Sequence, residues 1–408
     1  MAKTVYQELK PTARFWIPGL LIGAFLIAAA WAVYQAEHYG HIVTGMNNQV
    51  VWGLPHVFAI FLIVAASGAL NVASIASVFG RAAYKPMARL SALLAIALLA
   101  GGLAVLVLDL GRPDRLIVAM TKYNFRSIFA WNIYLYTGFF AVVGAYLFVQ
   151  MARGMHEKWV RRVGIVAFLW RLALTTGTGS IFGWLVARPG YDAAIMAPLF
   201  IAMSFSFGLA VFLLVQQLLF ALAGRPVGAG LIHRLGRLLG IFVALVLYFT
   251  AIQHLTALYA AEHADIERFI LREGGIYTAL FWGGQVLIGG LLPLVLVFHP
   301  AAAARPAATL LAAGLVIIGG FAQLYVIVIA GQAFPLESFP GYEVSSSFFD
   351  GVVAHYSPSL VELALGLGGI ALALTITALG AIVLRILPQE LSDSALDPTA
   401  TAASSNAA

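Results

Sequence analysis

Residues 50–80, VVWGLPHVFAIFLIVAASGALNVASIASVFG, form a long apolar segment in which His56 is the one ionisable side chain. A helix of about 20 apolar residues crosses the hydrocarbon core of a bilayer, so this segment predicts a membrane span that tilts or begins outside the core. Of the 408 residues, 62% are hydrophobic and 10% are charged, whereas soluble domains are roughly a quarter charged. The composition therefore predicts an integral membrane protein.

Ten hydrophobic segments predict an all-α protein with about ten transmembrane helices. We expect a single polytopic membrane domain over residues 1–388 and a polar, disordered tail over residues 389–408. The predicted helices cover residues 16–34, 50–79, 89–109, 128–150, 163–187, 195–222, 238–260, 276–298, 307–330 and 359–387.

The loops between these segments differ in positive charge. Most of the 23 Lys and Arg residues lie on the side that holds both termini, and Arg171 lies within a span. Positively charged loops remain in the cytoplasm, so both termini and the tail are predicted to be cytoplasmic. The loop that contains LDLGRPDR, residues 108–115, is then expected to face outward.

This outward loop combines a helix end with a cluster of charges. Gly111 suits the left-handed position after a helix, and Pro113 prevents the helix from continuing. Asp109, Arg112 and Arg115 therefore lie at the membrane edge. One interpretation is that Arg112 or Arg115 simply neutralises Asp109 there; the other is that the cluster forms a site.

Neighbouring spans bring further polar side chains to the same predicted level. Ionisable groups at membrane depth are costly, so they face a cavity or one another and often mark function. A quinone site needs donors for two carbonyl oxygens, titratable groups that exchange two protons, and an aromatic wall. His56 and Asp109 are the candidate catalytic pair, since they could exchange the protons. The candidate quinone-binding residues are His56, Asp109, Arg112, Arg115, Asn124, Ser127, Trp131 and Asn132.

The ending LDLGRPDR, followed by Asn124, Ser127 and Trp131, resembles the NrfD/PsrC family of quinone-interacting membrane subunits. The resemblance extends over nearly the whole chain. Within the family, it is most similar to the membrane subunit of a complex linked to dissimilatory sulfite reductase. The stretches that carry this similarity are residues 50–80, YVIVIAGQAFPLESFPGYE at 325–343 and YSPSLVELALGLGGIALAL at 356–374.

The resemblance implies two four-helix bundles, spans two to five and six to nine, flanked by the first and last spans. It implies a menaquinone or ubiquinone pocket in the first bundle, near the periplasmic face of a bacterial inner membrane. The implied partners are a periplasmic ferredoxin-like iron–sulfur subunit, a triheme cytochrome c, a haem b membrane subunit and a cytoplasmic iron–sulfur subunit. The acidic outer segment ESFPGYEVSSSFFDG, residues 337–351, is a candidate docking surface or a solvated loop.

The sequence contains no cysteine. Thiolate-held iron–sulfur clusters, covalent haem attachment and disulfides are therefore excluded for this chain. His254 lacks a second histidine at similar predicted depth, so we expect no haem and no metal site.

Polar groups within the predicted spans leave further alternatives open. Arg171, His254 and Glu362 could form a proton path, although hydrogen bonding between helices would also explain such groups. Ten spans would also suit a secondary transporter of a small sulfur anion, but the prolines lie near span ends rather than at the midplane breaks typical of carriers. A purely structural membrane anchor is the third possibility.

Overall fold

The computed structural model describes residues 4–336 and 351–393. Ten helices in this part of the chain are long and apolar enough to cross a membrane, which confirms the predicted all-α architecture. The ten spans are Ala13–Tyr39, Leu54–Ser77, Ala82–Leu108, Ile128–Met151, Glu157–Trp184, Met196–Leu222, Ala229–Tyr259, Ile276–Phe298, Pro306–Ala333 and Leu360–Val383.

Most spans contain one main helix, and several are divided into segments. The elements that form the spans are α1 (Ala13–Tyr39), α2 (Leu54–Ala69), α3 (Asn71–Ser77), η2 (Ala82–Met87), α4 (Ala88–Leu108), α6 (Ile128–Met151), α7 (Glu157–Trp184), α8 (Met196–Leu222), α9 (Ala229–Tyr259), α11 (Ile276–Ala279), η6 (Leu280–Leu291), α12 (Leu292–Phe298), α14 (Pro306–Tyr325), η7 (Val326–Ala330), α15 (Gly331–Ala333) and α16 (Leu360–Val383). The elements outside them are β1 (Tyr6–Gln7), η1 (His41–Val43), η3 (Pro113–Arg115), α5 (Leu116–Thr121), η4 (Ala261–His263), α10 (Ala264–Arg268), η5 (Phe269–Glu273), α13 (Pro300–Ala303) and β2 (Leu387–Pro388).

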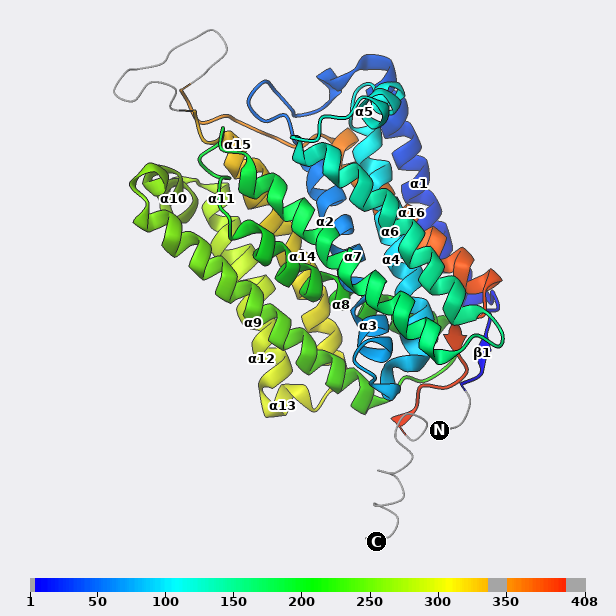
Figure 1. Cartoon of the computed structure of the whole chain (residues 1–408). Helices are drawn as coiled ribbons and strands as arrows, with labels where there is room; N and C mark the ends of the chain where they lie inside the picture. Colours follow the sequence, from blue (N-terminus) through cyan, green and yellow to red (C-terminus); the bar gives the residue numbers. More distant parts are fainter. Residues whose placement is uncertain (1–3, 337–350, 394–408) are drawn as a thin grey trace.

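The helices pack as two bundles that share a central contact (Figure 1). Helices α2, α4, α6 and α7 form the first bundle, and α8, α9, α14 and the span that contains η6 and α12 form the second. Helix α2 packs against α8 where the bundles meet, while α16 lies on α4 and carries α1 on its outer side. This is the arrangement that the family resemblance implies.

The contact between α2 and α8 depends on two glycines. A Cβ atom built on Gly208 would lie 2.1 Å from the carbonyl carbon of Gly68, and one built on Gly68 would lie 1.5 Å from the Ser204 oxygen. Small residues let helix backbones approach closely in membranes, where packing rather than the hydrophobic effect drives association. Helix α2 is almost completely enclosed, since all of its residues except Leu54 and His56 are buried.

The second span is broken near its middle. Helix α2 ends at Ala69 and α3 begins at Asn71. At the break, the Ser67 carbonyl accepts a hydrogen bond from Nη1 of Arg171 at 3.1 Å, while the Ser67 hydroxyl donates to the Arg171 carbonyl at 3.0 Å. A cation near the C-terminal end of a helix is favoured by the helix dipole. Arg171 thus supports the end of α2 inside the protein.

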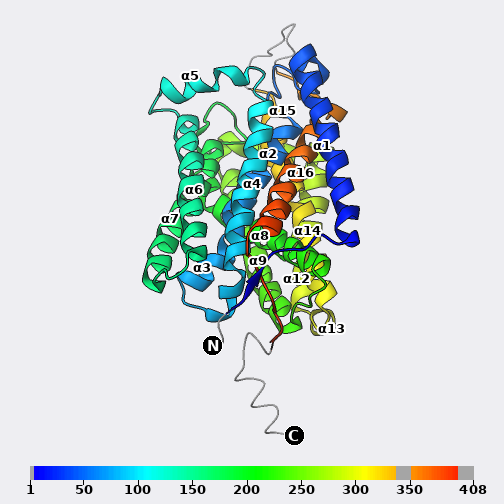
Figure 2. The same ribbon diagram turned by 90° about the vertical axis from the view of Figure 1, so that its right-hand side faces the viewer.

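The two ends of the described chain meet on one side of the bundles (Figure 2). Strands β1 and β2 pair in antiparallel fashion. Beyond β2, the Asp393 carboxylate accepts hydrogen bonds from the backbone N–H groups of Gly230 and Leu231, at the start of α9. Residues 389–393, assigned to the predicted disordered tail, are therefore packed, and residues 394–408 lie outside the described part. Which face is cytoplasmic stays a prediction from the loop charges.

We predict that Gly208→Ala lowers the stability of the protein, because its methyl group would overlap the backbone of α2. Overpacking of this kind costs about 1–3 kcal/mol or more. The matched control is Gly144→Ala on α6, where a Cβ would meet nothing within 4 Å. Thermal unfolding in detergent should show a lower midpoint for Gly208→Ala alone; equal midpoints would contradict the close helix contact.

Candidate functional site

His56 and Asp109 come together where α2 begins and α4 ends. Pro55 occupies the first turn of α2, a position that tolerates its missing N–H, and His56 follows it. Asp109 is the residue that caps the C-terminus of α4. Because α2 and α4 are packed neighbours, the two side chains meet, and Nδ1 of His56 lies 2.8 Å from Oδ2 of Asp109.

The pair is nearly enclosed. The side chain of His56 is 14% exposed and that of Asp109 is 4% exposed. A carboxylate with so little access to water needs a partner, and the imidazole supplies it. The two atoms lie at ion-pair distance without an aligned hydrogen bond. This contact leaves Nε2 of His56 for another partner.

Helix α4 ends where the sequence predicts, but the possible ion pair between Asp109 and Arg112 is not formed. Gly111 has φ +69°, as its position after the helix requires. Arg112 differs from the expectation, because it forms two hydrogen bonds of 2.9 and 2.8 Å with Asp114 instead of neutralising Asp109. These hydrogen bonds hold the pKa of Asp114 below its usual range. Arg115 is exposed, so the charge partner of Asp109 is His56.

Asn132 is the second buried polar group of this region. Its side chain is 2% exposed, and its amide nitrogen donates to the carbonyls of Ile128 and Gly177 at 2.9 and 3.1 Å. Its Oδ1 is buried with no hydrogen-bond partner among the described residues. Such an orphaned acceptor is rare in proteins and is available to a ligand that donates a hydrogen bond.

The other predicted residues of this segment lie further out. The Asn124 side chain accepts from the Arg126 backbone in a turn, and Ser127 precedes α6 without capping it through its side chain. Trp131 is 47% exposed and donates from Nε1 to the Phe125 carbonyl at 2.9 Å. The hydrogen bonds of Asn124 and Trp131 are thus made within the segment of residues 124–131.

The aromatic residue beside His56 is Trp52, which the sequence analysis did not select. The two rings are 5.9 Å apart and nearly parallel, with an interplanar angle of 22°. Phe129 lies edge-on to the same indole at 5.9 Å. Since Phe129 and Asn132 are three residues apart, they share one face of α6. Trp52 lies before the first residue of α2, in non-helical backbone, so helical spacing provided no signal for this contact.

A second buried pair lies in the other bundle. Nδ1 of His254 is 2.6 Å from Oε2 of Glu267, and the two side chains are 11% and 5% exposed. His254 lies five residues before the end of α9. Nearby, the amides of Gln285 and Gln323 both donate to the Thr250 hydroxyl at 3.3 Å.

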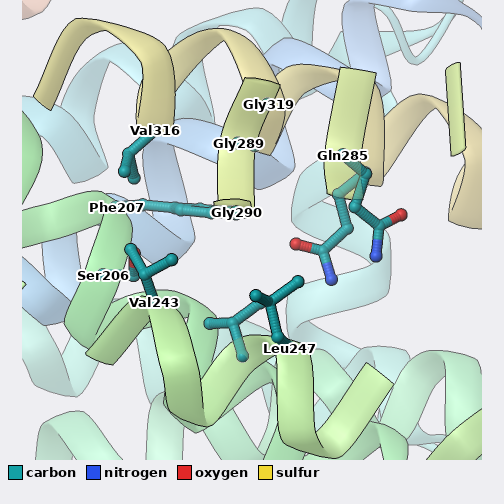
Figure 3. Close-up of a pocket in the computed structure, with 12 residues that line it drawn as sticks. Ser206, Phe207, Val243, Leu247, Gln285, Gly289, Gly290, Val316 and Gly319 are labelled. Carbon is teal, nitrogen blue, oxygen red and sulfur yellow. The ribbon is translucent and has the colours of Figure 1, made fainter. Parts of the chain in front are cut away.

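Two small cavities adjoin these groups. One of about 20 Å³ is bounded by Gln285 at one end and by Phe207 and Val243 at the other (Figure 3). One of about 10 Å³ is lined by His254, Gln285 and Gln323 among others. Each has room for about one water molecule, so neither can hold a quinone ring.

The other two residues of the predicted proton path have partners of their own. The Arg171 guanidinium lies between the rings of Phe168 and Phe205, 5.0 Å from each centroid. The Glu362 carboxylate accepts from Tyr356 at 2.7 Å and from the backbone of Gly45 and Ser359. Burial raises the pKa of Tyr356, so its hydroxyl stays a donor. A path through Arg171, His254 and Glu362 stays a prediction.

Comparison with known proteins identifies relatives over most of the chain. The family described as polysulphide reductase, NrfD, matches residues 42–336. An Hdr-like menaquinol oxidoreductase integral membrane subunit from Archaeoglobus fulgidus is 28% identical, covering 91% of this chain and 93% of its own. A putative membrane subunit of dimethyl sulfoxide reductase from Halobacterium salinarum is also 28% identical, over 95% and 94%. One of the polysulfide reductase chains from Wolinella succinogenes is 25% identical, over 70% and 96%.

We expect Glu267→Ala to destabilise the protein by about 2 kcal/mol, because it leaves the buried Nδ1 of His254 without its partner. The control is Glu262→Ala, since that side chain is 80% exposed and lies 3.7 Å from His263. Unfolding midpoints of the two variants should differ. If Glu267→Ala unfolded like the wild type, the His254–Glu267 contact would have no structural weight.

Proposed function

The chain belongs to the NrfD polysulphide reductase family, and from that premise we propose that it is the quinone-interacting membrane subunit of a multisubunit redox complex. In this proposal it exchanges electrons between the quinone pool and an iron–sulfur partner on its outer face. The observation that carries the proposal is the enclosed His56–Asp109 pair, which provides a titratable base beside an aromatic wall.

The polar groups of this region fit a quinol head group. A quinol has two hydroxyl donors, and its oxidised form has two carbonyl acceptors. The orphaned Oδ1 of Asn132 can accept from a hydroxyl, and His56 can accept or donate through Nε2. The rings of Trp52 and Phe129 can hold the flat head group by stacking or edge contacts.

A bound quinone supplies two-electron, two-proton redox chemistry, and the protein has to manage the protons. In quinol oxidation, Nε2 of His56 would accept the proton of one hydroxyl and release it to water before accepting the second, while the two electrons pass to the iron–sulfur partner. The Asp109 carboxylate, 2.8 Å from Nδ1, then stabilises the positive charge of the imidazolium. In the opposite direction the same ring donates the proton. A positioned general acid or base of this kind contributes roughly 10²–10⁴-fold to rate.

The other predicted site residues have a lesser part in this proposal. In this proposal, the approach to the pair is lined by Arg112, Arg115, Asn124, Ser127 and Trp131, where positive charge and hydrogen-bond donors would meet water, quinone or a partner subunit. We retain them as candidate quinone-binding residues, with His56, Asp109 and Asn132 closest to the chemistry.

The finer proposals come from the family resemblance. They are a DsrP-type role in dissimilatory sulfur metabolism, menaquinone or ubiquinone as the substrate, and a location in the bacterial inner membrane. The proposed partners are a periplasmic ferredoxin-like iron–sulfur subunit, a triheme cytochrome c, a haem b membrane subunit and a cytoplasmic iron–sulfur subunit. The candidate docking segment 337–351 falls almost wholly outside the described residues.

We predict that Asp109→Asn and His56→Ala assemble normally but slow quinone turnover by about 100-fold or more. Both should also weaken a fluorescent quinol-site inhibitor titrated into the purified complex, because the charge pair beside the head group is lost. The control is Asp265→Asn, an exposed acid of the second bundle that pairs with Arg268. Wild-type complex that binds no inhibitor would favour the anchor or transporter alternatives. Unchanged turnover in Asp109→Asn would remove this carboxylate from the mechanism.

A further inference from the structure

The chain that leads into α2 is held by a side chain from the other bundle. The backbone N–H groups of Val51 and Trp52 both donate to Oε1 of Gln332, each at 3.0 Å. Unpaired backbone N–H groups away from water are costly. Gln332 therefore satisfies two donors of a segment that is about 280 residues away in sequence.

The other half of the Gln332 amide is used as well. Its Nε2 donates to the Trp52 carbonyl at 3.0 Å and to the Val328 carbonyl at 2.7 Å. The side chain is 3% exposed. Both polar groups of the Trp52 backbone are thus bound by one amide, which fixes the direction in which the indole leaves the chain.

A π-helical segment in the ninth span comes just before Gln332 and affects the direction of its side chain. Gln332 follows the π-helical segment η7 (Val326–Ala330), and π-helical segments are frequent at functional sites because the extra residue redirects the side chains that follow. Arg188 contacts the same place, donating to the carbonyls of Gln332 and Gln49 at 3.2 and 3.1 Å. Hydrogen bonds from Gln332 and Arg188 thereby hold the chain just before α2.

Further contacts link this part of the ninth span to the aromatic residues around His56. Tyr191 donates to the Val328 carbonyl at 2.7 Å, and its ring lies nearly parallel to Trp52 at 6.3 Å. Trp52 in turn lies against His56. A continuous series of contacts therefore runs from Gln332 through Trp52 to the His56–Asp109 pair.

We propose that Gln332 is a positioning residue for the His56–Asp109 site and acts through Trp52. The inference rests on the proposed function, since it assigns the second bundle a part in quinone chemistry at the first. Removing the amide frees three backbone groups of residues 51 and 52, so the indole and the adjacent imidazole lose their fixed positions. Proton transfer and ring binding are sensitive to displacements below about 1 Å.

The test uses Gln332→Met, which keeps the length of the side chain and removes all four hydrogen bonds, and Gln332→Glu, which keeps the Oε1 acceptor. The matched control is Gln216→Met in α8, a buried amide that donates to the sulfur of Met87. Each variant of the intact complex is measured in two ways. Hydrogen exchange of residues 49–56 reports whether the Gln332 hydrogen bonds still hold this segment. Titration with heptyl-hydroxyquinoline N-oxide and the pH profile of turnover report the state of the His56–Asp109 site.

We expect Gln332→Met to speed exchange of this segment, to weaken inhibitor binding about tenfold and to alter the pH profile, with Gln332→Glu intermediate and Gln216→Met like the wild type. Faster exchange with unchanged binding and pH profile would make Gln332 merely structural and overturn the inference. Unchanged exchange would overturn it as well. Absence of inhibitor binding in the wild type would instead refute the proposed function, and this inference with it.

Discussion

The two helix bundles of this protein are joined where helices α2 and α8 cross, and each helix has a glycine at the crossing point. Gly68 of α2 and Gly208 of α8 bring their backbones into direct contact, and in a membrane such contact supplies much of the association energy. The contact makes α2 a central helix, enclosed by both bundles and by α16. The break after Ala69 and the guanidinium of Arg171 that supports it are also buried at this centre. His56, in the first turn of the same helix, is held by the same packing.

Enclosure determines the chemistry of the His56–Asp109 pair. In a low-dielectric surrounding, two opposite charges attract each other more strongly than they would in water. In the proposed function, the pair gains or releases one proton with a quinone, a substrate that exchanges protons and electrons together. The His254–Glu267 pair shows the same arrangement in the second bundle, but the cavities near it accommodate only water.

Hydropathy predicted the ten spans, because span length is a local property that a bilayer imposes on each segment. The helix end at Gly111 and the level shared by His56 and Asp109 could also be predicted, from backbone preferences and from alternating topology. The partners of individual side chains could not be predicted from the sequence. Arg112 is bound by Asp114 two residues away, and the backbone of Trp52, whose ring lies beside His56, is held by Gln332, which is distant in sequence. The Trp52–Gln332 contact is set by packing between helices and the Arg112–Asp114 pair by the local turn of the loop, and hydropathy reports neither.

Photolabelling with an azidoquinone tests the central claim most directly, because it reports where the head group lies in the intact complex. The His56–Asp109 site predicts label on the start of α2 or of α6, at Trp52, His56 or Phe129, and loss of that label when excess quinone competes. Label confined to the second bundle, around Gln285 and Gln323, would contradict the account, as would label that quinone does not displace.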